Sequence, residues 1–600
     1  MKQFGILPLL VMASILLSLL MGFRCAAFSQ DSPPRRVVFP YRKMGLTSQQ
    51  AAAHLLNRFT FGPTQGQVDK VVSAGLENWF IQQLEGGLSD TGMEYRLSKY
   101  DLLNLTDIQM VNTFLRPGEL LRAAQEYGIP IKDSADADAN LESNQAVRDM
   151  MKKKGYVTRA EYERQLEGQK VIRAVYSNNQ LREVLTDFWF NHFNVSFTKA
   201  ECRQYILSYE RDAIRPRVTG LFSKLLEEVA RHPAMLQYLD NASSVSMDNP
   251  AMRTFEKTER GKAFLTKYHP GLNENFAREV MELHTMGVDG GYSQKDVTEV
   301  ARALTGWTVY PLSPYQSYTR LSRLLIEKEG WDRLSRRGFL RMGDFLYRPD
   351  QHDEGAKSIL GHQFPAGGGY EEGVQVLELL AHQPSTAAFI CRKLAVHFVC
   401  DSPSAKLVNK MAAVFLQTGG DISRVLLTMV GSDEFWSREA LHEKVKSPFE
   451  LAVSAIRGAG ADIRQPFRLY VWCKNMGQRL YFFQAPTGFP DRSSYWINTG
   501  SLLSRMNFAL AFSAGAIPGV DLDLKALNDN REPESAEAAL RIYSGLLLPG
   551  RAQEDNIKRL TPLISEWRDR PAEKGVAYAD EPALNFIAGI IIGSPEFQRK

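Results

Sequence analysis

The stretch NENFAREVMELH, residues 273–284, shows the pattern on which the fold prediction rests. Asn273 is a residue type that caps helix N-termini, and Phe276, Val280 and Leu283 follow it at helical spacing. Apolar residues recur with the same three-to-four spacing along most of the chain, whereas strand signals are few. We therefore predict a mainly α fold, a large multi-helix domain within a single chain.

The charged residues of this predicted helix form a stripe. Glu274, Arg278 and Glu282 follow one another at every fourth position, and Glu279 lies on the same charged arc. At about 100° per residue, His284 falls in the apolar arc, roughly 160° from Glu282, so these two side chains cannot chelate one ion. The stripe has two interpretations. It is either a pair of carboxylates that an arginine holds in place for acid–base chemistry, or an exposed ladder of ion pairs, each of which contributes about 0.3–0.5 kcal/mol to stability.

The loop after this helix partly resembles a calcium-binding EF-hand loop. Its first two ligand positions would be Thr285 and Gly287, which carry no carboxylate and argue against calcium. Ser293 followed by Asp296 is instead typical of a capping box at the start of the next helix. We predict no metal site and no cofactor.

Two other clusters are rich in polar side chains. The run DFWFNHF, residues 187–193, places His192 on the apolar face of a predicted helix, where a histidine is usually a hydrogen-bonded core residue. His352 and Asp353, followed by Lys357, form the other cluster. Two core-facing histidines, His192 and His284, favour an internal polar site modestly.

Strand-like and polar segments interrupt the helical pattern. The runs 345–347 and 358–360, joined through Pro349 and Asp350, predict a small β-hairpin near 345–360. Residues 117–168 are polar and predict an exposed insertion, for which a loose loop and a solvated helix fit equally well. A second, basic insertion is expected near 313–343.

The first 30 residues are the most apolar part of the chain. Lys2 precedes an uncharged run over residues 4–23, and small residues surround a cleavage point before Gln30. This is typical of an export signal over residues 1–29, although the run is long enough to remain as an uncleaved membrane anchor. A linker over 30–45 and a helical domain over 46–600 follow. We expect a periplasmic or extracellular protein, membrane-tethered only if the signal persists.

Charge and cysteine usage restrict the functional classes. Lys and Arg number 72 against 68 Asp and Glu, a balance that argues against a nucleic-acid binder. In an exported chain Cys202, Cys391, Cys400 and Cys473 allow three disulfide pairings. Cys391 and Cys400 lie on one predicted helix about 13 Å apart, too far for a bridge without a break between them.

Common catalytic signatures are missing from the sequence. It contains no G-x-S-x-G, H-E-x-x-H, Walker or G-x-G-x-x-G motif. This argues against common serine hydrolases, zincins, nucleotide triphosphatases and dinucleotide enzymes.

Several motifs, in order, resemble the bacterial domain-of-unknown-function family 1800. They are LLNRFTFGPT (55–64), FWFNHF (188–193), NEN (273–275) with RE (278–279) and ELH (282–284), DGGY (289–292), LTGW (304–307), HD (352–353) with Gly355 and Lys357, PTGFPD (486–491), Trp496 and Arg505. The resemblance runs from about residue 46 to the C-terminus. It implies a mainly helical, often exported protein without an agreed activity, whose relatives often occur beside exported proteins similar to alkaline phosphatases and sulfatases.

Two functional hypotheses follow from these residues and from the resemblance. The first is a helical scaffold for an exported partner, similar to an alkaline phosphatase or sulfatase, with a buried polar network of Asn191, Asn273, Asn275, His284 and Lys357. The alternative is a hydrolase of envelope or extracellular polymers, of the glycoside-cleaving type, with the candidate catalytic residues Glu274, Arg278, Glu279, Glu282, His192, His352 and Asp353. Nucleic acid is not expected as a partner under either hypothesis.

Overall fold

The structure is a computed structural model that describes residues 38–131, 141–246, 248, 250–268, 271–316, 319–551, 554–568 and 581–600. The predicted signal or anchor over residues 1–29 lies outside the described residues, as does the linker up to residue 37. The chain divides into two units, Met1–Val38 and Phe39–Lys600, and every element below belongs to the second. No helix among the described residues combines the length and the apolar character needed to cross a bilayer.

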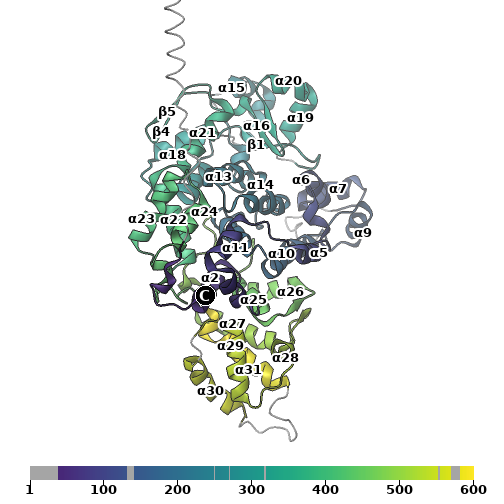
Figure 1. Cartoon of the computed structure of the whole chain (residues 1–600). Coiled ribbons are helices and arrows are strands. Elements are labelled where there is room, and N and C mark those ends of the chain that lie inside the picture. The colour runs from purple at the N-terminus through teal and green to yellow at the C-terminus, as the bar shows by residue number, and fades with distance from the viewer. Residues whose placement is uncertain are drawn as a thin grey trace, which may run out of the picture. The chain divides into compact units, whose positions relative to one another are not determined.

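The second unit is mainly helical, as predicted (Figure 1). The first part contains η1 (Pro40–Arg42), α2 (Ser48–Phe59), α3 (Gln67–Ala74), α4 (Leu76–Glu85), α5 (Thr91–Leu97), η2 (Asp101–Asn104), α6 (Asp107–Thr113), α7 (Pro117–Glu126), α9 (Gln145–Lys154), α10 (Arg159–Tyr176) and α11 (Gln180–His192). The middle contains η3 (Arg203–Tyr205), α12 (Ile206–Ser208), η4 (Tyr209–Ile214), η5 (Arg215–Arg217), α13 (Phe222–Arg231), α14 (Pro233–Tyr238), η6 (Asn241–Ser243), α15 (Pro250–Glu256), α16 (Glu259–Tyr268), α17 (Glu274–Glu279), η7 (Val280–Met286), α18 (Gln294–Ala303), α19 (Arg320–Glu329), α20 (Trp331–Arg336) and η8 (Pro349–Gln351). The last part contains α21 (Gly369–Ala381), α22 (Pro384–Phe398), α23 (Ala405–Gln417), α24 (Ile422–Val430), η9 (Glu434–Trp436), α25 (Pro448–Ala459), α26 (Pro466–Asn475), η10 (Ser493–Trp496), α27 (Thr499–Ser513), α28 (Leu524–Leu527), α29 (Ala536–Leu547), α30 (Glu554–Arg568), α31 (Glu581–Gly593) and α32 (Pro595–Gln598).

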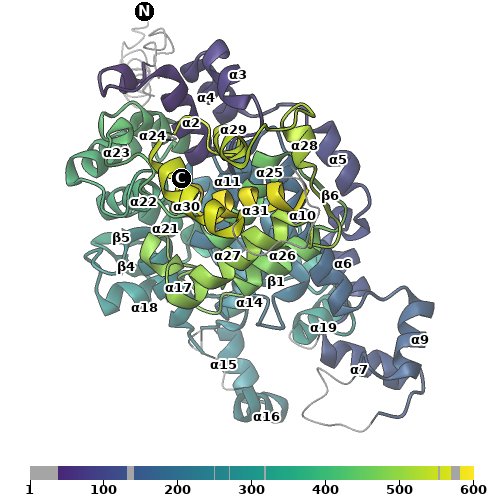
Figure 2. The same ribbon diagram turned by 90° about the horizontal axis from the view of Figure 1, so that it is seen from below.

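The core is built around helices that are buried on most of their circumference. α2 and α25 are buried on nearly every side, so they pack inside the protein rather than on its surface. α10 packs against α26, α22 against α23, and α27 against α31. Figure 2 shows α31 beside α27, with α26 next to them.

Local capping signals set several helix starts. Ser293 and Asp296 form the predicted capping box at the start of α18, with the hydroxyl and the carboxylate each accepting from the other residue's backbone N–H. Ser447 and Glu450 form the same arrangement at α25. Asn273 caps α17 as predicted, because its side-chain oxygen accepts from the Asn275 N–H at 2.8 Å.

β3 (Phe345–Tyr347) and β4 (Lys357–Ile359) lie at or next to the two predicted runs, 345–347 and 358–360, but their pairing differs from the prediction, and the other strands were not predicted. β1 (Trp307–Val309), β3 and β2 (Leu340–Met342) form one antiparallel sheet in the order β1-β3-β2. β4 pairs instead with β5 (His362–Phe364), and β6 (Asp462–Ile463) with β7 (Val520–Asp521). The predicted pairing of 345–347 with 358–360 is wrong because each run has a closer hairpin partner across its own short turn.

The two predicted insertions each contain a small hydrophobic cluster. In the first, Leu115, Leu120, Ala123, Ala124, Leu141, Val147, Met150 and Met151 pack together. In the second, Leu334 and Phe339 pack with Leu346 of β3. Residues 159–168 belong to α10, and Tyr162, Leu166 and Glu167 are buried, so the expectation of an exposed segment is wrong there.

The four cysteines Cys202, Cys391, Cys400 and Cys473 all carry free thiols. Cys391 and Cys400 are not bridged, but the expectation that one helix carries both is wrong, because α22 ends at Phe398.

Candidate functional site

The predicted charge stripe lies at the half-exposed surface between α17 and α18. Arg278 reaches Glu274 at 3.7 Å, and their side chains are 40% and 36% exposed. Glu274 also accepts from Gln294 and from the Thr298 hydroxyl, both at 2.7 Å. These contacts link α17 to α18 through charged groups that water screens. The stripe is therefore an exposed ladder of ion pairs, the second of the two interpretations of the sequence.

The predicted straight helix ends earlier than expected. From Val280 onward the backbone is a π-helix, η7, which changes the direction of every later side chain relative to an α-helical wheel. Glu282 accepts a hydrogen bond from the Tyr292 hydroxyl at 3.1 Å. Burial raises the pKa of Glu279, and the charge of Glu282 adds to this effect. Asn275 is exposed.

His192 and His284 are core residues, as their apolar faces predicted. Each is 1% exposed, and a ring nitrogen of His192 lies 3.1 Å from the carbonyl oxygen of His284. Burial lowers the pKa of His192 well below its ordinary value and that of His284 to about 3. Both imidazoles are therefore neutral at physiological pH.

His352, Asp353 and Lys357 belong to a closed polar cluster with Glu372 of α21 and Arg302 of α18. The ammonium of Lys357 lies 2.7 Å from Glu372, and Nε2 of His352 lies 3.3 Å from the same carboxylate. The Asp353 carboxylate accepts two hydrogen bonds from the Arg302 guanidinium, at 2.8 and 3.2 Å. His352, Lys357 and Glu372 are each at most 2% exposed, so this cluster fixes packing without offering a surface to a ligand.

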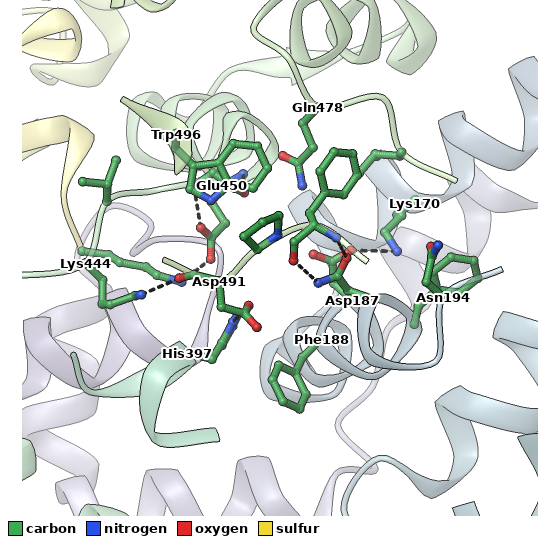
Figure 3. Close-up of a pocket in the computed structure, with 18 of the residues that line it drawn as sticks. Lys170, Asp187, Phe188, Asn194, His397, Lys444, Glu450, Gln478, Asp491 and Trp496 are labelled. Atoms are coloured by element: carbon green, nitrogen blue, oxygen red, sulfur yellow. Dashed lines mark hydrogen bonds and ion pairs between the residues drawn. The ribbon is translucent and has the colours of Figure 1, made fainter. Parts of the chain in front are cut away.

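A pocket lies elsewhere, where α10, α11, α22 and α25 meet the 478–496 segment (Figure 3). It takes in about 720 Å³ of space between atoms, part of which is open solvent. Its lining residues are Lys170, Asp187, Phe188, Phe190, Asn191, Asn194, His397, Lys444, Val445, Ser447, Glu450, Gln478, Leu480, Tyr481, Phe489, Pro490, Asp491, Trp496 and Lys600. Of the residues predicted from sequence, Asn191 alone is among them.

A histidine–aspartate pair forms one side of this pocket. Nδ1 of His397, in the last turn of α22, lies 3.0 Å from a carboxylate oxygen of Asp491. Burial alone would raise the pKa of Asp491, but its bond to His397 and the charges of His397, Lys393 and Lys444 hold the pKa below its ordinary value. The carboxylate therefore stays ionised and places the imidazole proton on Nδ1.

The other ring nitrogen of His397, Nε2, is buried. Within the described part of the chain, no hydrogen-bond partner reaches the buried Nε2 atom. With the proton held on Nδ1 by Asp491, Nε2 carries the lone pair and can accept a proton. Lys444 supports the pair from behind by donating to the carbonyl oxygen of Asp491 at 2.6 Å and pairing with Asp401.

The opposite side of the pocket carries Lys170 and Asp187, 2.9 Å apart (Figure 3). Lys170 also lies 3.0 Å from Glu210, which in turn lies 2.6 Å from Arg215. Burial alone would raise the pKa of Glu210, but these two cations and the Tyr481 hydroxyl lower it to about 2. Glu210 sits on the π-helix η4, so the backbone irregularity places this carboxylate behind the pocket wall.

The loop over 486–491 is held by Asn191 of α11. The Asn191 side chain accepts from the Phe489 N–H at 2.7 Å and donates to the Phe489 carbonyl at 2.8 Å. Gly488 has a φ of +68°, and a Cβ there would lie 2.1 Å from the backbone oxygen of Asn191. Only glycine fits this approach, which brings Asp491 to His397.

Sequence reasoning did not select the pocket residues as a site. Asn191, Asp491 and Trp496 lie in motifs that carried the family resemblance, and that shared membership was the one usable signal. Asp187 directly precedes one of these motifs. His397 lies in no such motif, and a lone histidine on an amphipathic helix is indistinguishable from a core residue in a single sequence.

Comparison with known proteins identifies a family and no activity. No curated protein matches this chain. No solved structure matches it either. The model of the family described as Protein of unknown function (DUF1800) matches residues 54–599, and the chain therefore belongs to this family.

Proposed function

We propose that this protein is an exported acid–base hydrolase whose pocket binds a polar ligand of the cell envelope and whose catalytic base is His397. One observation carries the proposal: His397 lines the pocket, its imidazole is oriented by Asp491 at Nδ1, and no group among the described residues forms a hydrogen bond with its buried Nε2. Support for export comes from the apolar run after Lys2.

The chemistry follows from the arrangement of the pair. Nε2 of His397 takes a proton from a water molecule as the water oxygen attacks the ligand, and the resulting imidazolium faces the charge of Asp491. The same proton then passes to the leaving group, which restores the neutral histidine. Asp187, on the opposite side, accepts hydrogen bonds from ligand hydroxyls, and its geometry is fixed by Lys170.

This hydrolase differs from the glutamate-based alternative considered from the sequence. Glu274 and Arg278 are screened by water, and neither they nor Glu282 line this pocket. The glycoside-cleaving reaction remains compatible with the pocket, since rings such as Trp496 and Phe489 offer flat faces and Asp187 offers an acceptor.

The test compares wild type, His397→Gln and Asp491→Asn for release of soluble sugars or peptides from isolated envelope polymers. A positioned general base contributes about 10²–10⁴-fold, so both variants should lose activity by that factor. Glu282→Gln, at a partly exposed position outside the pocket, is the matched control and should retain it. Equal rates for wild type and His397→Gln, or no release by wild type, would contradict the proposal.

A helical scaffold for an exported partner is the second candidate. The closed cluster of His352, Lys357 and Glu372 favours it, because buried ion pairs of this kind fix helix packing rather than contact ligands. Capture of one exported protein, similar to an alkaline phosphatase or sulfatase, by wild type and His397→Gln alike would support this candidate if neither protein releases product.

A further inference from the structure

An exposed apolar stripe runs along α27. Leu502, Met506 and Leu510 recur at every fourth position, with Leu503 beside them, and these side chains are 41% to 62% exposed. The opposite side of α27 is buried against α31. Most helices of this chain turn polar side chains outward, so a stripe of this kind indicates an apolar occupant.

The segment that carries the stripe, residues 493–520, has no exposed charge. Between residues 493 and 520 the single ionisable cation or anion is Arg505, and its guanidinium is buried, donating to Gln598 and to the carbonyl oxygen of Lys446, each at 2.8 Å. Protein–protein interfaces usually have a polar rim whose charges orient the partner, and an uncharged surface does not provide such charges. It suits a hydrocarbon chain.

The helix that carries the stripe begins next to a residue of the pocket wall. Trp496 lines the pocket and lies immediately before α27, and its neighbours Tyr495 and Ile497 are 43% and 40% exposed. The Ser501 hydroxyl donates to the Trp496 carbonyl at 2.9 Å, which fixes the start of the helix to the pocket wall. From Leu502 to Leu510 the stripe extends about 12 Å, at about 1.5 Å per residue.

The pocket is polar, and each lysine that lines it is paired with a carboxylate. The pairs are Lys170 with Asp187, Lys444 with Asp401, and Lys600 with Glu450. The remaining carboxylate, Asp491, faces His397. No lining lysine is left unpaired for an anionic ligand, so the pocket suits a head group with hydroxyl or amide functions.

We infer that the ligand of this protein is an amphiphile, with a polar head of hydroxyl or amide functions in the pocket and a hydrocarbon chain lying along Leu502, Leu503, Met506 and Leu510. The inference rests on the pocket of the proposed function and adds the class of ligand. The alkyl chain binds by removing apolar surface from water, and the head places the bond to be cleaved beside His397.

The experiment measures binding of alkyl maltosides with 6 to 12 carbons, below their micelle concentrations, and of maltose, to the full chain by calorimetry. Each methylene buried on the stripe should tighten binding about fourfold, the factor that corresponds to about 0.8 kcal/mol. The double variant Leu503→Ser/Met506→Ser should lose this dependence on chain length. The double variant Ile108→Ser/Val288→Ser, whose parent side chains are 51% and 66% exposed elsewhere, should keep it.

Affinity that does not change with chain length, or that changes equally in both double variants, overturns the inference. Binding to uncharged phosphatidylcholine vesicles without saturable binding of monomeric maltosides assigns the stripe to a membrane and also overturns it. The proposed function is judged separately: loss of product release in His397→Gln upholds it even where the chain-length series fails. Full release by His397→Gln refutes it even where the series succeeds.

Discussion

The ladder on α17 and the pocket at His397 are both built from carboxylates and cations, yet they offer very different chemistry. Glu274 and Arg278 are more than a third exposed and lie 3.7 Å apart. His397 and Asp491 are less than a fifth exposed and lie 3.0 Å apart beside an enclosed space. Water screens the first pair and is largely excluded from the second, so enclosure rather than charge density distinguishes a candidate site.

The largest loss of stability is expected from a substitution at Glu210, which lies behind the pocket wall. Glu210→Gln removes a fully buried carboxylate from Lys170 and Arg215 and should cost about 3–5 kcal/mol of unfolding free energy. Glu274→Gln on the ladder should cost about 0.5 kcal/mol or less. Urea unfolding at pH 7 measures both, and similar losses for the two variants would remove the distinction between the regions.

Acidification between pH 5 and pH 2 should destabilise the pocket region. The folded-state pKa of Glu210 and of Glu450 is about 2, below the ordinary 4.5, because their cationic partners outweigh burial. A depressed carboxylate pKa adds stability above pH 4.5 that is lost as the pH falls toward 2, about 3 kcal/mol for each group. Glu167, whose pKa burial raises to about 8, is protonated in both states below pH 4.5 and adds nothing there.

The measurement for this pH effect is the urea midpoint at several values between pH 5 and pH 2. Glu210→Gln should show a shallower loss over that window than wild type, whereas Glu274→Gln should follow wild type. A wild-type midpoint that rises on acidification would show that the buried carboxylates are not held in their charged form.

Two glycines provide the smallest contrast. Gly488 and Gly291 both have positive φ, +68° and +85°, so alanine costs about 1–2 kcal/mol at either position. At Gly488 the new Cβ also meets the backbone oxygen of Asn191, while at Gly291 no atom lies within 4 Å. Gly488→Ala should therefore lose more stability and also weaken ligand binding, and Gly291→Ala should leave binding unchanged. Equal binding by both variants would show that the 486–491 loop does not position Asp491.

The sequence predicted the parts of the fold that local interactions determine. Apolar spacing predicted the helices, the pair Ser293 and Asp296 predicted a capping box, and the apolar faces predicted that His192 and His284 are buried. The π-helix at Val280 was not predictable, because the backbone there departs from the α-helical period on which the wheel depends. Strand pairing was also wrong, since short runs carry little register information.

The pocket could not be predicted because its parts are distant in sequence. His397 and Asp491 are 94 positions apart, and neither has neighbours that signal chemistry. Glu210 and Tyr481, which meet behind the wall at 2.8 Å, are 271 positions apart. A single sequence gives the side chains but does not show which of them come together in one pocket after folding.

By itself, the sequence determined a mainly helical chain, an apolar start typical of export, and membership of a family that the whole domain matches. These are properties of composition, period and local capping, each decided within a few turns of helix. Only the tertiary structure decided that the dense stripe at 274–282 is a solvated ladder and that His397, Asp491 and Asp187 surround a pocket. The reason is physical: burial and mutual distance set how strongly charges act, and both arise when distant helices pack.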